Sequence, residues 1–306
     1  ERCDLARERF GCRTYGDYHE MLAAETVDLV CVLSRSDQHC PMTCDALSAG
    51  HNVLVTKPWA IDEGEARRMI DAAEKAGRLL LPWLPARWGA DLARLRRLIA
   101  DGAVGKPFMV RRVQSGYGRR KDWQTQSRHG GGYLLNWGPH IVDTAVQVIG
   151  RPVASAFGRL RNPINVGDAE DAFLAVLTMD DGTVVQAEYA VAAIALPKWV
   201  IQGDRGMIVV RGDRDLTVRT GEPPMPADPT EFAGMRADEI EEATERIEGD
   251  TEGEPVGIYR EVAAALRGEA DCAVTPADAL ELTRTLDAIR LSDREDRVVH
   301  LEAGSE

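Results

Sequence analysis

Apolar runs alternate with helical patterns along the first hundred residues. Val27–Ser34 is a continuous apolar run of strand length, Asn52–Thr56 is a second one, and Leu79–Leu81 is a shorter third. Apolar runs without regular polar alternation are typical of parallel strands that are covered on both faces. The pattern therefore predicts three strands of a parallel sheet.

The segments between these strands have the spacing of helices. Asp62 and Glu65 form a capping-box pattern, an apolar stripe follows, and Gly77 ends that helix. An earlier helix covers His39–Ala49 and ends at Gly50. Strands that alternate with helices predict a doubly wound α/β domain of the Rossmann type. Ligands of such sheets bind beyond the carboxyl ends of the strands.

The pattern changes to that of antiparallel hairpins from about residue 108 onward. Asp171–Met179 and Thr183–Val191 flank the tight turn Asp181-Gly182, and Trp199–Gly203 pairs in the same way with Met207–Arg211. Successive hairpins predict an α+β domain with a large open, mostly antiparallel sheet. We therefore expect two consecutive domains, residues 1–107 and residues 108–306.

Two further segments complete the second domain. A helix is predicted to begin at Thr275-Pro276, and its apolar stripe consists of Ala279, Leu282, Leu286 and Ile289. Residues 221–254 are rich in proline, glycine and acidic side chains, and we expect them to form an excursion on the surface.

Charge and composition exclude several classes of protein. A net charge of -13 argues against binding to nucleic acid or to an anionic membrane surface. We find no apolar run of membrane-spanning length and no signal-peptide pattern, so we expect a cytoplasmic protein. The six cysteines form no CxxC pair; Cys40 and Cys44 lie one helical turn apart, which is a weak metal signal. We expect reduced thiols and no metal site.

Lys57 stands at the carboxyl end of the second apolar run and is followed by Pro58. Lysine is unusual in this chain, where most basic positions are arginine. A compact ammonium with three donors suits a point contact with a ligand at this edge of the sheet. A lysine that only reaches solvent from a strand end is the alternative, and the residue alone leaves both open.

A second motif is the sequence GGGYLLNWGPHIVD at residues 130–143. The three glycines allow close backbone approach or positive φ angles. Helical spacing after them brings Asn136, His140 and Asp143 near one face. A histidine on such a helix is either a hydrogen-bonded core residue or a catalytic base, and the spacing does not decide between them.

Together the two motifs resemble the glucose-fructose oxidoreductase, inositol dehydrogenase and MocA family, and the resemblance covers nearly the whole chain, including residues 27–77. It implies an NAD(P)-dependent oxidoreductase that transfers hydride between a nicotinamide and a secondary alcohol or ketone. The substrate would be a sugar, an inositol or a related polyol. Because the same fold serves in a transcriptional co-repressor that binds dinucleotide, a non-catalytic dinucleotide- or sugar-sensing regulator is the alternative.

The resemblance also implies roles for the central residues. Lys57 would stabilise negative charge on the substrate oxygen and contact the nicotinamide ribose. His140 would take the proton of the alcohol, and Asn136 would orient its ring. The bond before Pro58 is expected to be cis by the same resemblance.

The chain departs from the family pattern at two positions. Thr56 stands where the family usually has glutamate, and Asn136 stands where it usually has aspartate. Asparagine keeps a hydrogen bond but loses the charge that would stabilise an imidazolium. Asp143 lies one turn beyond His140 and either replaces part of that charge or is only structural.

Further contacts are implied by the same alignment of motifs. NAD or NADP would contact Ser34, Ser36, His39, Lys57, Pro58 and Arg87. The substrate would contact Lys57, Trp123, Arg128, Asn136 and His140. A homo-oligomer is also implied, with the open sheet as its interface and Phe173, Trp199 and Ile201 as sources of apolar area.

The first residues bear on the cofactor site. Domains of this type normally open with a strand, a glycine-rich turn and a helix that holds the pyrophosphate. Glu1–Gly11 instead has the pattern of a later helix, and no GxGxxG follows. We therefore expect an N-terminally truncated chain without the first strands, with a loose first domain, little affinity for either cofactor and little activity of its own.

Overall fold

The computed structural model describes residues 1–222, 230, 232 and 239–302, and the chain divides into two compact units. The first unit contains residues 1–83 and 261–280, and the second contains residues 84–260 and the chain from 281 onward. This division differs from the two consecutive domains that the sequence predicts. The physical reason is an apolar cluster in which Val262, late in the chain, packs against Leu54 and Leu81.

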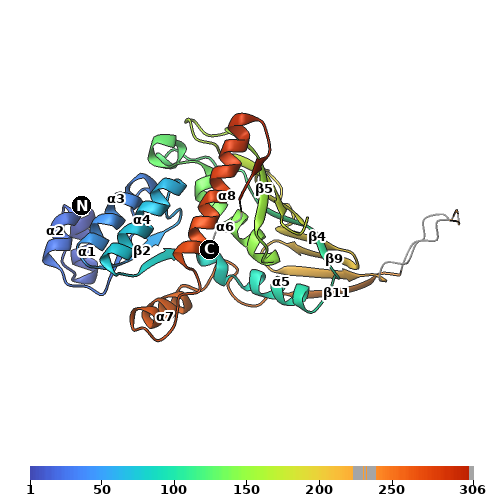
Figure 1. Ribbon diagram of the computed structural model, residues 1–306, viewed down its shortest axis with the longest axis horizontal. Helices are drawn as coiled ribbons and strands as arrows, with labels where there is room; N and C mark the ends of the chain where they lie inside the picture. The colour runs from blue at the N-terminus through green and yellow to red at the C-terminus, as the bar shows by residue number, and fades with distance from the viewer. Residues whose placement is uncertain (223–229, 231, 233–238, 303–306) are drawn as a thin grey trace. The chain divides into compact units, whose positions relative to one another are not determined.

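The first unit contains a parallel sheet of three strands in the order β1-β2-β3, so the Rossmann-type expectation is confirmed. The predicted strands form with small shifts at their ends, and helices α3 and α4 pack against each other beside β2 (Figure 1). The elements of this unit up to residue 83 are α1 (Arg2–Phe10), α2 (Tyr18–Ala24), β1 (Leu29–Val32), α3 (Ser36–Ser48), β2 (Asn52–Thr56), α4 (Glu63–Ala76) and β3 (Leu80–Trp83).

Local signals in the sequence set the ends of α4. The Asp62 carboxylate accepts the Glu65 N–H at 2.8 Å, and the Glu65 carboxylate accepts the Ile61 N–H at 3.1 Å. Gly77 ends the helix with φ 60, a left-handed conformation that suits glycine. The predicted N-cap at Asp62 and the stop at Gly77 are therefore confirmed, while the Glu65 side chain bonds the residue before the N-cap, so the capping box is not closed.

The second unit is built on a nine-stranded sheet in the order β11-β10-β9-β8-β4-β7-β6-β5-β12. All neighbours are antiparallel except β4 and β7, which confirms the mostly antiparallel sheet and both predicted hairpins. The strands are β4 (Pro107–Gly116), β5 (Val153–Arg161), β6 (Ala172–Met179), β7 (Val184–Val191), β8 (Trp199–Gly203), β9 (Gly206–Arg211), β10 (Asp215–Thr220), β11 (Glu241–Arg246) and β12 (Val299–His300).

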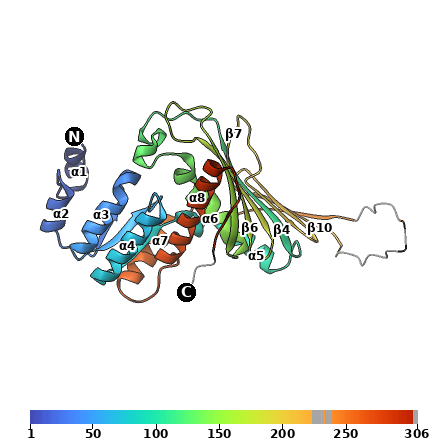
Figure 2. The ribbon, with the colours of Figure 1, turned by 45° about the horizontal axis from the view of Figure 1, so that its top comes forward.

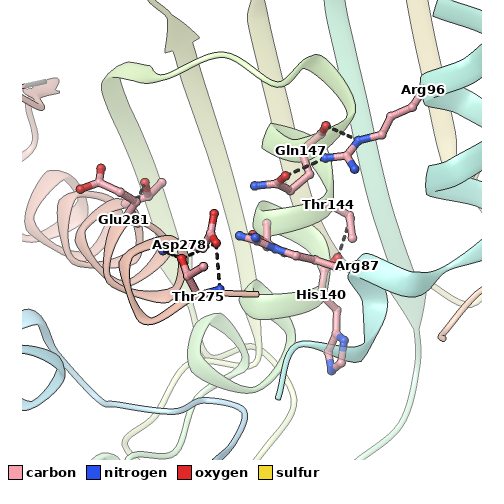
Figure 3. A network of polar contacts seen from close by, with 10 residues as sticks. Arg87, Arg96, His140, Thr144, Gln147, Thr275, Asp278 and Glu281 are labelled. Carbon is pink, nitrogen blue, oxygen red and sulfur yellow. Dashed lines mark hydrogen bonds and ion pairs between the residues drawn. The ribbon is translucent and has the colours of Figure 1, made fainter. Parts of the chain in front are cut away.

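Helices cover one face of this sheet, and Figure 2 shows α6 and α8 on that face. The predicted stripe of α8 is buried, with Ile289 packed on Gly158 of β5 and Leu286 close to Gly138 of α6. Asp278 accepts hydrogen bonds from Thr275 at the start of α8 (Figure 3). The remaining helical elements are η1 (Pro85–Trp88), α5 (Ala90–Ala100), η2 (Trp123–Thr125), η3 (Ser127–His129), α6 (Tyr133–Ile149), α7 (Pro255–Leu266) and α8 (Pro276–Glu295).

One expectation about this unit needs correction. Phe173, Trp199 and Ile201 are at most 2% exposed, because they lie on the helix-covered face, where the Trp199 indole donates to Asp91 of α5. They therefore supply no apolar area to an interface. Within the predicted surface excursion, Glu241–Arg246 forms the exposed edge strand β11, and residues 223–229, 231 and 233–238 of the excursion lie outside the described residues.

All six cysteines are free thiols, as expected.

Among the helices in the described part of the chain, none combines the length and the apolar character that crossing a membrane requires.

Candidate active site

Lys57 follows the carboxyl end of β2 and is half-buried. The peptide bond between Lys57 and Pro58 is cis, as the family resemblance implies. The next two residues, Trp59 and Ala60, are each 2% exposed. The backbone is therefore anchored directly after the strand, while the lysine side chain keeps access to the end of the sheet.

His39 joins the segments that follow β1 and β2. Its Nδ1 lies 2.7 Å from the Pro58 carbonyl oxygen, and its Nε2 lies 3.0 Å from the Ser34 carbonyl oxygen. Burial lowers the pKa of His39, and the two carbonyl acceptors oppose that shift. The ring therefore stabilises the two segments against each other.

The carboxyl ends of β1 and β2 fit the polar parts of a dinucleotide. Ser34 and Lys57 are half-buried there, and Ser36 lies buried in the first turn of α3. The N-cap residue of α3 is Arg35, whose side chain makes no capping bond. The first N–H groups of α3 are therefore not satisfied by that side chain. Hydroxyl, ammonium and N–H donors at the end of a parallel sheet suit ribose and phosphate oxygens.

In the second unit, the glycine turn opens α6. Gly130 and Gly132 have φ angles of 65 and 103, and a Cβ atom on Gly132 would lie 2.4 Å from a carboxylate oxygen of Glu170. Glu170 uses that space to bind the first turn of the helix. Its side chain accepts the Leu134 N–H and its carbonyl accepts the Tyr133 N–H, both at 2.9 Å.

Glu170 was not predicted as a member of the site. No local signal in the sequence marks it, because it lies 36 residues from the N–H group that it caps. Burial raises the pKa of its carboxyl group, although the hydrogen bond from Leu134 favours the charged form. The interaction fixes the start of the helix that carries Asn136 and His140.

Asn136 and His140 occupy successive turns of α6, and both are half-buried. The Thr144 hydroxyl donates to the His140 carbonyl at 2.6 Å. Figure 3 shows the His140 ring pointing away from Thr144 and Gln147. The ring lies 6.1 Å from that of Trp137, measured between centroids. The spacing prediction that puts both polar side chains on this helix is therefore confirmed.

Asp143 lies one turn further and pairs with Arg87 of η1. The Arg87 guanidinium donates to both carboxylate oxygens, at 2.9 and 2.8 Å, and the two side chains are only 10% and 3% exposed. This bidentate pair fixes α6 on η1. That Asp143 supplies part of the missing charge beside His140 stays a prediction. Arg87 thus clamps α6, and its predicted contact with the cofactor stays a prediction.

Arg96 of α5 holds the next part of the helix. It donates to the Gln147 carbonyl at 2.8 Å and to the Gln147 side chain at 2.7 Å (Figure 3). Burial, and then the charge of Arg87, lower the pKa of Arg96. Three elements therefore fix α6 along its length.

Trp123 and Arg128 lie on the loop before the glycine turn. Trp123 is half-buried, and Arg128 is exposed with its Nε atom 3.0 Å from the side-chain oxygen of Gln126. The backbone carbonyls of Gln124 and Gln126 accept the N–H groups of Gly132 and Gly131. The predicted residues thus form two sets, one around Lys57 in the first unit and one around His140 in the second.

Comparisons with known proteins agree with this architecture. Residues 1–82 match a family model described as an oxidoreductase family with an NAD-binding Rossmann fold. Residues 92–209 match the GFO/IDH/MocA C-terminal domain. Among solved structures, an NAD-binding protein from Listeria innocua aligns with 97% of this chain and 85% of its own at a TM-score of 0.84 and 22% identity. GenD2 from gentamicin A biosynthesis was solved in complex with NAD. It aligns with 98% of this chain and 85% of its own at a TM-score of 0.79 and 26% identity.

The curated relatives are dehydrogenases and oxidoreductases. D-apiose dehydrogenase of Paraburkholderia graminis is 27% identical over 99% of this chain and 81% of its own. The NADP(+)-dependent scyllo-inositol 2-dehydrogenase of Bacillus subtilis is 25% identical over 94% of this chain and 82% of its own. The oxidoreductase YdgJ of Escherichia coli is 29% identical over 61% of this chain, which spans 54% of YdgJ. The chain belongs to the glucose-fructose oxidoreductase, inositol dehydrogenase and MocA family of oxidoreductases, whose N-terminal domain is an NAD-binding Rossmann fold.

Proposed function

We propose that this protein transfers hydride between a nicotinamide cofactor, NAD or NADP, and a secondary alcohol or ketone of a sugar, an inositol or a related polyol. The observation that carries the proposal is the retention of Lys57 at the end of β2 together with His140 on the glycine-opened helix α6. The named activities of the two dehydrogenase relatives support the substrate class.

Oxidation of a secondary alcohol removes a hydride from carbon and a proton from oxygen, and a carbon–oxygen double bond forms. The bound nicotinamide supplies the hydride acceptor. In our proposal Lys57 donates to the substrate oxygen and stabilises the negative charge that develops there. His140 takes the proton, which contributes about 10²–10⁴-fold in rate for a well-placed base. Asn136 orients the substrate or the ring by hydrogen bonding, without a charge.

A cofactor-bound sensor is the second candidate, and one observation favours it. Thr56 and Asn136 replace the two acidic residues of the family pattern. A weaker base would slow turnover, and a sensor tolerates that loss.

A substrate screen separates the two candidates. Polyols, inositols and aldoses are incubated with the full-length protein and each nicotinamide, and reduced cofactor is measured together with the carbonyl product. We expect equal amounts of both from at least one substrate. Tight binding of cofactor or sugar without turnover of any compound would favour the sensor.

A further inference from the structure

The loop before the glycine turn, residues 117–129, concentrates positive charge in a chain whose net charge is -13. We call it the basic loop. Asp122 is its only carboxylate, and Arg120 donates to both oxygens of that carboxylate, at 3.2 and 2.8 Å. The cations of the loop are Arg119, Arg120, Lys121 and Arg128.

Two carboxylates hold the backbone of the loop, and one of them, Asp122, also neutralises Arg120. Asp122 also accepts the Gln124 N–H at 3.1 Å. Asp168, outside the loop, accepts the N–H and the hydroxyl of Ser127 at 2.8 and 2.6 Å. Hydrogen bonds from Ser127 lower the pKa of Asp168, and the charge of Arg128 adds a smaller contribution. The loop is therefore fixed while much of its positive charge stays at the surface.

Arg119 and Lys121 are both exposed. Neither side chain forms an ion pair or hydrogen bond with any residue that the structure describes. Arg128 is also exposed, and its side chain donates to the neutral amide of Gln126. Its charge acts on Asp168 without a hydrogen bond among the described contacts of that carboxylate. Exposed arginine and lysine in a fixed loop are the donors that phosphate and carboxylate groups bind.

The loop lies against the helix of the proposed active site. The Gly132 N–H donates to the Gln124 carbonyl at 2.9 Å, which ties the loop to the first turn of α6. A Cβ atom on Gly131 would lie 2.6 Å from that same carbonyl oxygen, so loop and turn are in close contact. The pKa of Arg120 is raised, mainly by its hydrogen bonds to Asp122 and to a smaller extent by the nearby Tyr133 and Tyr189.

Aromatic rings connect this region with His140. The ring centroids of Tyr133 and Tyr189 are 4.6 Å apart, and those of Tyr189 and Trp137 are 5.4 Å apart. Trp137 in turn lies 6.1 Å from the His140 ring. One packed aromatic cluster therefore connects the basic loop with His140: Tyr133 and Tyr189 are buried within it, and Trp137 is half-buried.

We propose that the substrate carries an anionic group, a phosphate ester or a carboxylate, which the basic loop binds through Arg119, Lys121 and Arg128. The inference rests on the proposed function, because it names the substrate class of that same site. Positive charge on a loop that contacts the first turn of α6 attracts an anionic substrate and selects it over its neutral counterpart.

The test measures binding and therefore does not need turnover. Calorimetric titrations compare glucose 6-phosphate, glucuronate and glucose, first in low salt and then in about 1 M salt, where charges are screened within about 3 Å. We expect one or both anionic probes to bind at least roughly tenfold more tightly than glucose in low salt, with the advantage lost in high salt. The two anionic arms distinguish a phosphate from a carboxylate.

A double variant assigns the effect to the loop. Arg119→Gln/Lys121→Gln is expected to weaken binding of the anionic probe by roughly tenfold, since each exposed ionic contact contributes a few-fold. The matched control is Arg211→Gln/Arg214→Gln, which removes the same charge at the β9–β10 turn and should leave binding unchanged. The proposal is overturned if no anionic probe binds better than glucose, or if both double variants act alike. Anion-selective binding without oxidation of any polyol would instead refute the proposed function alone.

Discussion

At the residue scale, Lys57 is the side chain on which the proposed chemistry depends most. Lys57→Met keeps the length of the side chain and removes its charge and donors. We expect kcat to fall by on the order of two to four powers of ten, because a donor at the developing negative charge acts mainly in the transition state. Steady-state kinetics with the best substrate measures the change. Lys75→Met, on the exposed face of α4, is the control and should be neutral. Activity of Lys57→Met within a few-fold of wild type would remove Lys57 from the mechanism.

His140 and Asn136 make a second prediction at this scale. If His140 is the base, its deprotonation gives the acidic limb of the pH profile of kcat/KM. Asn136→Asp places a carboxylate one turn away, which favours the imidazolium and raises the pKa of His140. The limb should therefore move to higher pH. Asn162→Asp, an equal charge change on an exposed residue, should leave the limb in place. A limb that moves equally in both variants, or in neither, would show that the two residues do not interact.

At the scale of elements, α6 depends on its pair with η1. Arg87→Ala leaves the Asp143 carboxylate buried without its charged partner, and we expect a loss of about 3–5 kcal/mol in the free energy of unfolding. The exposed pair between Arg151 and Asp180 is the comparison, and Arg151→Ala should cost less than about 1 kcal/mol. Urea denaturation measures both variants. Equal losses would mean that burial adds nothing to the Arg87 pair.

The cap of α6 predicts a pH effect on stability. Because the native pKa of Glu170 is raised, the folded protein binds that proton more tightly than the unfolded chain does. Stability from this group is therefore present at low pH and lost as pH rises through the native pKa. Glu170→Gln keeps an acceptor for Leu134 but cannot titrate, so it should gain stability relative to wild type between about pH 4 and neutrality. Thermal unfolding across that range tests this, with Glu248→Gln as an exposed control. A stability difference between Glu170→Gln and wild type that stays constant with pH would contradict this prediction.

Local elements were predicted well from the sequence, because caps, turns and apolar periodicity act over a few residues. The α4 cap at Asp62, the Asp181-Gly182 turn and the α8 stripe are examples. The pairing of Arg87 with Asp143 was not predicted, since the two residues lie 56 positions apart and neither has a local signal for the other. The return of residues 261–280 to the first unit was missed for the same reason. The site residues themselves came from motifs, and their roles remain predictions.

At the scale of the whole molecule, we predict a homo-oligomer that forms through the open face of the nine-stranded sheet. Leu174 and Val176 of β6 alternate with the buried residues of that strand and are only half-buried, so they offer apolar area on the open face. Leu174→Glu should weaken association strongly, because a two-fold interface would bring two new charges into it. Light scattering at micromolar concentration measures the mass. Val166→Glu, at a position that is 93% exposed, is the control. A wild-type monomer would refute the prediction.

The claim at the centre of this account is direct hydride transfer from a substrate carbon, and isotope transfer tests it most directly. The best polyol from the screen is prepared with deuterium on the reacting carbon and incubated with the protein and oxidised nicotinamide. Mass spectrometry of the reduced cofactor then follows the label. We predict one deuterium in each reduced nicotinamide and one ketone formed for each, with both products formed on the order of two to four powers of ten more slowly in Lys57→Met. Reduced cofactor without deuterium, or bound cofactor that is never reduced by any polyol, would contradict the account.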